Sequence, residues 1–416
     1  MRSPRLLTVV ALVVVARAGW PQGNPVGPEF RVNTWTTYLQ ARPSVAADPA
    51  GNFVVVWESE PHDSVKEVFA QRFGDTGTPV GQEFRVNTYV PGNHNLTSVA
   101  VDPTGNFTVV WTMLDGLSNG VFGRRYGSSG VPLGNEFRVN TYTASSQFGP
   151  AVAADSSGNF VVVWASSFQD GSFSGIYGQR YESSGTPLGN EFRVNTFTTN
   201  YQVNPTVAMD SAGNFVVVWW SRYPIPPGTG FGVSGQRFAS SGVPLGPEFR
   251  VNTATGNLRY SVVGADSMGD FVVVWHNDGQ YGSGLGVFGQ RFASSGMPLG
   301  SEFRVNTHTT GSQGYSSVAV DASGNFVVAW QGFNQDGADY GVFGQRYASS
   351  GSPLGPEFRV NDFTPSYQGR PRIAADAAGN FVVVWQSQGQ DGSNYGVFGQ
   401  RFNMIVPVEL MNFRLE

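Results

Sequence analysis

The chain consists of seven tandem copies of one sequence unit, and this repetition constrains its fold more than any other feature. The string Glu-Phe-Arg-Val-Asn recurs every 53 to 57 residues, starting at Glu29, Glu83, Glu136, Glu191, Glu248, Glu302 and Glu357. A string close to Asp-x-x-Gly-Asn-Phe-Val-Val-Val-Trp follows each copy, and one close to Val-Phe-Gly-Gln-Arg-aromatic comes after that. Seven copies in phase indicate a repeat architecture.

The residue pattern of each unit predicts four β-strands. The first unit serves as the example. Ser44–Asp48 carries small side chains that suit an innermost strand, and Phe53–Trp57 is apolar on both faces, as in a strand covered on both sides. Val68–Phe73 is the third strand, with Gly at its centre in six units and Ala70 in the other. We expect this Gly to make room for the repeated Trp of a neighbouring unit. Glu83–Thr88 alternates polar and apolar residues, as an outer strand does.

Four-stranded units repeated around an axis form a β-propeller, and the register of the repeats favours this fold over an open β-solenoid. The chain begins with an outer strand, Glu29–Thr34, and the seventh unit ends on its third strand near Phe402. We predict an all-β, seven-bladed β-propeller with four antiparallel strands per blade over residues 19–402, its ring closed by the N-terminal outer strand. Residues 403–416 are a tail or, through residues 413–415, an alternative outer strand.

The N-terminus has the composition of a secretory signal peptide. Two arginines precede the apolar run Leu6–Ala16, which is too short to span a bilayer comfortably. We predict cleavage after Ala18, removal of residues 1–18, and secretion to the periplasm or the outside of the cell. Cleavage deletes three arginines and takes the formal net charge from −5 to −8, which disfavours nucleic acid as a partner. No later segment resembles a membrane span, and we expect a monomer.

The turns of such a propeller fall on two faces. The first-to-second and third-to-fourth turns are nearly identical in every unit, whereas the second-to-third and fourth-to-first loops vary. Variation on a rigid scaffold is where recognition is usually placed, and the variable loops carry the acidic and aromatic side chains that suit sugars. The predicted ligand-binding residues on this variable-loop face are Asp115, Asp170, Asp278, Asp336, Asp391, Trp220, Tyr223, Tyr281, Tyr340 and Tyr395.

These features also have structural interpretations. The Asp-Gly pairs fit plain turns, and the aromatic side chains fit loops that pack against each other. Ca²⁺ takes six to eight oxygen ligands, and one Asp per loop is few, so we predict no cofactor and no metal site, with Ca²⁺ as the alternative. No nucleophile or phosphate-loop motif occurs, and no catalytic residue is predicted. We expect the repeated arginines of the third string to pair with repeated carboxylates.

Five strings carry a resemblance that covers nearly all of residues 25–402: Glu-Phe-Arg-Val-Asn-Thr, Ser-Val-Ala-x-Asp, Gly-Asn-Phe-Val-Val-Val-Trp, Gln-Asp-Gly-Ser and Gly-Val-Phe-Gly-Gln-Arg-Tyr. Together they resemble the repeats of large secreted bacterial surface proteins, including adhesin-like and RTX-associated ones. The resemblance implies a bacterial, extracellular origin and no specific chemistry. The inner hairpin also looks like NHL-type propeller repeats, whereas the Asp box of sialidases, Ser-x-Asp-x-Gly-x-x-Trp, is not matched.

The leading hypothesis is a secreted, non-enzymatic binding or surface-interaction protein that holds a glycan or another extracellular protein on the variable-loop face. The first alternative is a polysaccharide-acting enzyme, a lyase or a glycoside hydrolase, for which the sequence offers acid and base candidates only among the Asp-Gly loops, such as Asp336 and Asp391. The second alternative is a purely structural module of a larger assembly.

Overall fold

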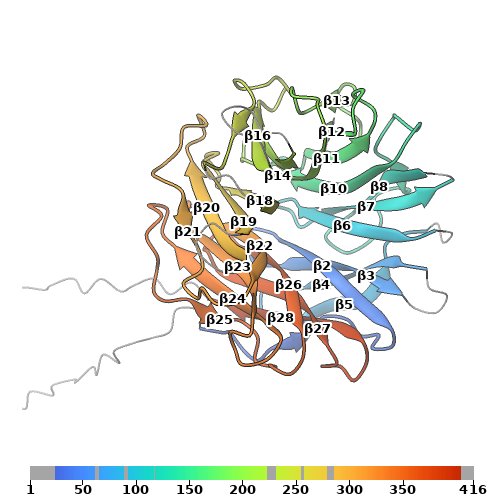
Figure 1. The fold of residues 1–416 in the computed structure, drawn as a ribbon. Helices are drawn as coiled ribbons and strands as arrows, with labels where there is room; N and C mark the ends of the chain where they lie inside the picture. Colours follow the sequence, from blue (N-terminus) through green and yellow to red (C-terminus); the bar gives the residue numbers. More distant parts are fainter. Residues whose placement is uncertain are drawn as a thin grey trace, which may run out of the picture.

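The computed structural model describes residues 24–60, 65–88, 92–116, 118–222, 231–253, 257–278 and 285–403. Within these ranges the chain forms 28 β-strands and no helix, and therefore no helix long and apolar enough to cross a membrane. The strands form seven four-stranded antiparallel sheets, and a single bridge between Leu39 and Tyr395 joins the first sheet to the last. Figure 1 shows the sheets arranged around a common centre with the first strand of each innermost. The fold is a β-propeller of seven four-stranded blades, as the sequence predicts.

The blades are numbered 1 to 7 in chain order. Their first, innermost strands are β2 (Leu39–Ala47), β6 (His94–Val101), β10 (Gln147–Ala154), β14 (Gln202–Met209), β18 (Asn257–Ala265), β22 (Gln313–Val320) and β26 (Gln368–Ala375). The second strands are β3 (Phe53–Glu60), β7 (Phe107–Asp115), β11 (Phe160–Ser167), β15 (Phe215–Ser221), β19 (Phe271–Asp278), β23 (Phe326–Phe333) and β27 (Phe381–Gln388).

The third strands are β4 (Glu67–Phe73), β8 (Ser118–Tyr126), β12 (Ser174–Tyr181), β16 (Gly232–Phe238), β20 (Leu285–Phe292), β24 (Tyr340–Tyr347) and β28 (Tyr395–Phe402). The fourth strands are β5 (Pro79–Arg85), β9 (Phe137–Arg138), β13 (Phe192–Arg193), β17 (Phe249–Arg250), β21 (Phe303–Arg304), β25 (Phe358–Arg359) and, for blade 7, β1 (Phe30–Arg31).

The second strands form the core, because their side chains are apolar on both faces and neighbouring blades cover both. Each buried core cluster in the described residues joins the side chains of two adjacent blades, and one of them joins blade 7 to blade 1. The repeated Trp that ends each Phe-Val-Val-Val-Trp string is fully buried, which confirms that these residues belong to the core: Trp57, Trp111, Trp164, Trp219, Trp275, Trp330 and Trp385.

The Phe of each Glu-Phe-Arg-Val-Asn string packs against the next blade. Phe192 of blade 3 has its ring centre 5.5 Å from that of Phe238 in blade 4, and Phe238 stacks on Phe215 at 4.9 Å. The other blade junctions contain the same aromatic pairing, including the contact of Phe30 with Phe73 between blades 7 and 1. This Phe therefore contributes to every contact between blades.

The Gly at the centre of the third strand makes room for this same Phe. In blade 4, Gly235 is paired with Phe249, and a Cβ added at Gly235 would lie 2.7 Å from Phe249 Cζ. The expectation that the Gly accommodates a Trp from a neighbouring unit is therefore wrong. The close approach comes from the outer strand of the same blade, and it recurs at Gly123, Gly178, Gly289, Gly344 and Gly399.

The fourth strands all end at the Arg of the string, earlier than predicted, because side chains replace part of the backbone ladder. Six of them contain two residues, whereas β5 begins at Pro79 and contains seven. In blade 4, Asn252 Oδ1 accepts the Val233 N–H at 2.8 Å, and the Asn of every other blade makes the equivalent bond. Glu248 Oε2 accepts the N–H of Thr196 in the preceding blade at 2.7 Å, and this bond also recurs at the other junctions. The repetition of the string Glu-Phe-Arg-Val-Asn is thus explained by the contacts that its side chains make within and between blades.

Strand β1 lies at the outer edge of the sheet of blade 7. Strand β1 pairs antiparallel with β28, with Phe30 opposite Gly399 and Arg31 opposite Phe398. The predicted signal peptide, residues 1–18, and the alternative outer strand, residues 413–415, both lie outside the described residues.

A buried histidine interrupts a repeated glutamine near the start of the first strands. His94 of blade 2 is fully buried, its Nδ1 lies 3.0 Å from the Lys66 carbonyl oxygen, and its Nε2 has no hydrogen-bond partner. Burial lowers the pKa of His94 below the ordinary value of 6.5. Five other blades have Gln at this position: Gln40, Gln147, Gln202, Gln313 and Gln368.

We predict that His94 makes the fold sensitive to acid. Its folded-state pKa is lower than its unfolded-state pKa, so the unfolded chain binds the extra proton first. The stabilisation by neutral His94 is complete above pH 6.5 and is lost as the pH falls below it, by at most about 1.4 kcal/mol per pH unit. Denaturant unfolding of the native chain and of His94→Gln between pH 7.5 and pH 5 measures the difference. Parallel losses of stability in the two proteins would contradict the prediction.

Candidate functional site

The first strand of every blade contains a β-bulge close to the variable-loop face. In blade 6, the pairing with the second strand shifts between Gly314 and Ser317, and Tyr315 between them has a φ of 49°. The equivalent shift occurs in all blades. We call the seven residues at this position, whose φ lies between 45° and 62°, the bulge ring: Arg42, Leu96, Gly149, Asn204, Tyr260, Tyr315 and Arg370.

The left-handed backbone of the bulge ring is strained for residues other than Gly, and least so for Asn. Only blade 3 uses Gly there, at Gly149, while the other six positions keep a side chain at a cost in backbone energy. Strain of this kind concentrates at functional sites. The bulge ring is therefore a candidate position for a functional site.

In five blades the bulge also bonds to the preceding blade. The Tyr315 N–H donates to Nδ1 of His276 in blade 5 at 3.3 Å, and the Arg370 N–H donates to Oε1 of Gln331 in blade 6 at 3.0 Å. Each acceptor directly follows the core Trp of a second strand, a position whose residue differs between blades. The equivalent bonds are Leu96 to Glu58, Gly149 to Thr112 and Arg42 to Gln386.

Blades 5 to 7 gather aromatic and cationic side chains at these positions. The ring centres of Tyr260 and Tyr315 are 5.1 Å apart, and that of His276 lies 5.4 Å from Tyr260. The Arg370 guanidinium lies over the Tyr315 ring, with Cζ 4.7 Å from its centre, a cation–π contact. Tyr260 is 42% exposed, so a ligand can reach it. We call Tyr260, His276, Tyr315, Arg370 and Arg372 the axial cluster.

Arg372 adds a second positive charge to the axial cluster. Burial, and then the charge of Arg370, lower the pKa of Arg372 to about 10, while Tyr260 raises it. Arg372 therefore stays protonated at neutral pH, and no described carboxylate forms an ion pair with either arginine. The equivalent position carries a small or uncharged residue in the other blades: Ser44, Ser98, Ala151, Thr206, Val262 and Ser317.

Three more tyrosines extend the cluster outward over blades 6 and 7. The Tyr367 hydroxyl donates to Gln331 Oε1 at 2.9 Å, the same oxygen that accepts the Arg370 N–H. Tyr340 and Tyr395 pack edge-on against Tyr367, with ring centres 5.5 and 5.9 Å away. Burial raises the pKa of Tyr367 to about 12, so it remains a hydrogen-bond donor at neutral pH.

Trp220 continues the aromatic surface into blade 4. Its ring stacks on Phe231, with centres 4.9 Å apart, and its Nε1–H donates to the Leu258 carbonyl, two residues before Tyr260. Three of the ten residues predicted to bind a ligand thus adjoin the axial cluster: Trp220, Tyr340 and Tyr395.

Glu58 is the one carboxylate among the described residues of the bulge ring and its acceptors. Its Oε1 lies 3.4 Å from Arg42 Nη1, and its Oε2 lies 3.7 Å from Lys66 Nζ. The Leu96 N–H also donates to Oε1, and the side chain is only 1% exposed. Held by two cations and a backbone donor, Glu58 is placed to order the ring rather than to transfer protons.

Three of the predicted Asp-Gly loops make the contacts of plain turns. The carboxylates of Asp170, Asp336 and Asp391 each accept the N–H two residues further on, at 3.1, 3.4 and 3.2 Å. Each carboxylate also rests against a Gly near the start of the third strand. The structure does not bring these three carboxylates into the axial cluster, and their role as ligands stays a prediction.

The remaining predicted residues divide into two groups. Asp115 forms an ion pair with Arg138, at 2.5 Å between Oδ2 and Nη1. Asp278 ends β19, and its side chain is outside the described part of the chain. Tyr223 and Tyr281 lie outside the described residues.

Sequence reasoning missed Arg370, Arg372 and Gln331 and gave His276 no role. The signal was present as departures from the repeat. Arg372 interrupts a column of small residues, and the residue after each core Trp is Glu, Thr, Ala, Trp, His, Gln and Gln in turn. Positions that vary within an otherwise invariant repeat are those at which the fold does not require a particular residue.

The repeated arginines of the third string act on the opposite face. Arg72 Nη1 donates to the carbonyl oxygen of Ser128 in the next blade at 2.5 Å, and Arg237 bonds in the same way to Ser294. Arg125, Arg180 and Arg291 make the equivalent contact. Their hydrogen-bond partners are therefore carbonyl oxygens and not the carboxylates that we expected.

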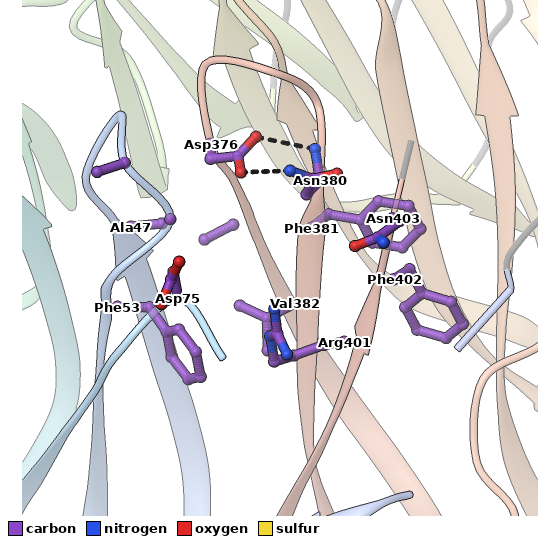
Figure 2. Close-up of a pocket in the computed structure, with 13 residues that line it drawn as sticks. Ala47, Phe53, Asp75, Asp376, Asn380, Phe381, Val382, Arg401, Phe402 and Asn403 are labelled. Carbon is purple, nitrogen blue, oxygen red and sulfur yellow. Dashed lines mark hydrogen bonds between the residues drawn. The ribbon is translucent and has the colours of Figure 1, made fainter. Parts of the chain in front are cut away.

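A cavity of about 230 Å³ opens on that opposite face between blades 7 and 1. Figure 2 shows the turn beside it, in which Asn380 donates to Asp376 from its backbone N–H at 2.9 Å and from its side chain at 2.7 Å. Equivalent residues line smaller cavities at three other junctions. A feature that recurs between blades belongs to the scaffold, and we assign it no function.

Comparison with known proteins gives a likeness of fold. No family model and no curated protein matches the sequence. Solved structures do match. A protein of unknown function from Dyadobacter fermentans has a TM-score of 0.53 at 10% identity, covering 92% of this chain and 99% of that one. The polysaccharide lyase Uly1 has a TM-score of 0.51 at 10% identity (86% and 90%). The Penicillium chrysogenum α-L-arabinanase, complexed with arabinobiose, has a TM-score of 0.50 at 13% identity (77% and 96%).

At these identities the likeness establishes a propeller-type fold. The named enzymes among these structures act on glycans, and this corrects the leading expectation of a non-enzymatic binding protein in favour of its enzymatic alternative. The resemblance to adhesin-like, RTX-associated and NHL-type repeats receives no support and stays a prediction.

We predict that Gly149→Ala destabilises the chain through backbone strain alone. Gly149 has a φ of 62°, and a Cβ there would have no neighbour within 4 Å. The free energy of unfolding should fall by about 1–2 kcal/mol. Gly134→Ala is the matched control, because that site is equally open and has no positive φ, so it should be neutral or slightly stabilising. Equal denaturation midpoints for the two variants would show that the bulge position is unstrained.

Proposed function

We propose that this chain is an enzyme that cleaves polysaccharides at the axial cluster. The observation that carries the proposal is the bulge ring, where six of seven positions keep a side chain despite a left-handed backbone. Evolution toward stability alone favours Gly at such positions. A side chain that is kept at such a position therefore has a role in its contacts. In blades 5 to 7 the bulge-ring residues are Tyr260, Tyr315 and Arg370.

The surroundings of the cluster suit a sugar polymer. Trp220 donates from Nε1–H to the Leu258 carbonyl, two residues before Tyr260. Tyr367, which shares Gln331 with Arg370, packs against Tyr340 and Tyr395. Aromatic faces beside hydroxyl and amide groups are the surfaces on which sugar rings pack. The arabinanase and the polysaccharide lyase of similar fold add support for a glycan substrate.

The chemistry of the cluster differs from that of a two-carboxylate glycosidase. Retaining and inverting glycosidases place two carboxyl groups on either side of the scissile bond. The bulge ring and its acceptors offer only Glu58 among the described residues, and two cations hold it. Proton transfer in this site therefore falls to phenols and imidazole, of which Tyr260 is the most exposed.

We test this function with the matched variants Tyr260→Phe and Tyr142→Phe. Tyr142 lies in a variable loop of blade 2, away from the axial cluster. Wild type should release new reducing ends from a polysaccharide panel. Loss of a proton-transferring hydroxyl should lower kcat about 100-fold or more in Tyr260→Phe, with KM little changed, whereas Tyr142→Phe should keep its activity.

Two outcomes would overturn this assignment. One is a wild-type chain, folded by circular dichroism, that releases no reducing ends from any polymer of the panel. The other is full activity in Tyr260→Phe together with loss in Asp391→Ala, which would move the chemistry to the Asp-Gly loops.

We also infer that the ring is closed by the N-terminal outer strand. Several contacts support this. Strand β1 pairs with β28, the Asp362 N–H donates to Glu29 Oε2 at 2.8 Å, and Phe30 lies between Phe73 and blade 7 as its counterparts do at other junctions. Residues 413–415 remain the alternative.

Phe30→Ala tests this closure against Phe192→Ala. The two rings make matched contacts, with centres 5.4 Å from Phe73 and 5.5 Å from Phe238. If β1 closes the ring, each truncation should lower the free energy of unfolding by a similar amount, about 3 kcal/mol. Denaturant titration measures both. A cost for Phe192→Ala with none for Phe30→Ala would contradict closure by the N-terminal strand.

A further inference from the structure

The two arginines of the axial cluster form a positive site without a described counter-ion. Arg370 and Arg372 are two residues apart on β26, and the charge of one lowers the pKa of the other. The Arg370 guanidinium lies on the Tyr315 ring, and Arg372 Nη1 donates to the carbonyl of the adjacent Pro371 at 3.0 Å. No ion pair with a carboxylate of the described chain relieves either charge.

Two like charges held together and partly withdrawn from water are unfavourable unless an anion joins them. A structural role does not explain the pair, because six other blades build the same strand with small or uncharged residues at the position of Arg372. Guanidinium groups bind carboxylates through paired N–H donors. The pair is therefore suited to a planar carboxylate carried by the substrate.

We propose that Arg370 and Arg372 bind the carboxylate of a hexuronate unit, and that the enzyme cleaves its polymer by β-elimination at Tyr260. This inference rests on the proposed function and names its substrate class and reaction. Sugar polymers with free carboxylates are the expected substrates, and neutral glycans are not.

The reaction balances without a co-reactant. The Tyr260 phenolate removes the proton from the carbon that bears the carboxylate. The electron pair of that C–H bond forms a double bond to the next ring carbon, and the glycosidic C–O bond at that carbon breaks. The departing oxygen takes a proton from a phenol of the cluster, for which Tyr315 lies nearest, its ring centre 5.1 Å from that of Tyr260.

The arginines accelerate the removal of the proton beside the carboxylate, which is otherwise slow. The hydrogen beside an ionised carboxylate is a very weak acid, because its removal places further negative charge on the same group. Fixed positive charges at that carboxylate stabilise the charge that develops in the transition state. A cation beside a phenol also favours the phenolate, the form that accepts a proton. His276 is a positioning residue here, since its Nδ1 accepts the Tyr315 N–H.

Binding is tested first, by a readout independent of turnover. Thermal unfolding of the mature chain is followed with glucuronate, galacturonate, the neutral sugars glucose and galactose, and sodium sulfate or phosphate at equal ionic strength. We expect the uronates alone to raise Tm, and we expect the rise to vanish in Arg372→Gln. Arg372→Gln should be at least as stable as wild type without ligand, because it removes a like-charge repulsion. Equal rises from sulfate, phosphate and uronates would indicate a general anion site and overturn the proposal.

Cleavage is tested next on polymers of galacturonate, of glucuronate, and of mannuronate with guluronate, beside carboxyl-reduced forms and neutral arabinan. Two readouts run together: new reducing ends, which report any cleavage, and ultraviolet absorbance of the conjugated double bond, which reports elimination alone. We expect both signals to rise on at least one carboxylated polymer, to be absent on its reduced form, and to fall about 100-fold in Arg370→Gln and Arg372→Gln. Arg372→Lys should recover part of the rate.

The two readouts separate failure of this inference from failure of the proposed function. Reducing ends without absorbance, or cleavage of neutral arabinan, would leave a polysaccharide-cleaving enzyme and reject elimination at a uronate. Absence of both signals on every polymer would reject the proposed function as well. Unchanged rates in folded Arg370→Gln and Arg372→Gln would reject the role of the two arginines.

Discussion

The bulge in the first strand is the constraint on which the site depends. In each blade the strand slips by one residue against its neighbour, and the residue at the slip adopts a left-handed backbone. The N–H exposed by the slip is then bonded, in five blades, by a side chain from the preceding blade. A purely local irregularity thus becomes a contact between blades, and it brings two variable positions together at each of these five junctions.

Other residues of the repeat make the contacts that hold the blades together, so the residues at these variable positions can differ between blades. The Phe of each outer strand packs on the next blade, the Glu before it bonds to the preceding blade, and the Asn after it completes the ladder of its own blade. On the opposite face, arginines such as Arg72 bond to carbonyl oxygens of the next blade. Because these contacts do not involve the bulge ring, its side chains can differ from blade to blade without loss of the fold. Only blades 5 to 7 combine tyrosines with arginines there, which makes a nearly symmetric scaffold chemically one-sided.

The fold was largely predictable from the sequence, because periodicity reports it directly. The string Phe-Val-Val-Val-Trp predicts a buried strand, and seven copies in phase predict seven blades. Three details were not predictable in the same way. The outer strands end early because Asn252 and its equivalents bond to the ladder through their side chains, which alternation of polar and apolar residues does not reveal. The central Gly of the third strand faces Phe249 and its equivalents instead of a Trp, because the partner depends on register. Closure of the ring also depends on which terminal segment pairs with β28.

The site was harder to predict because the bulge has no sequence signature. The residues of the bulge ring share a position but range over Arg, Leu, Gly, Asn and Tyr, and the period of a strand gives no sign of a slipped register. Loop composition instead drew attention to Asp-Gly pairs, of which Asp170, Asp336 and Asp391 form turns. The most direct test of the account is a crystal structure of the mature Tyr260→Phe chain with a hexuronate oligosaccharide. The account predicts a sugar carboxylate between Arg370 and Arg372, with the neighbouring glycosidic oxygen near residues 260 and 315. Sugar bound only at the Asp-Gly loops, or in the cavities of the opposite face, would contradict it.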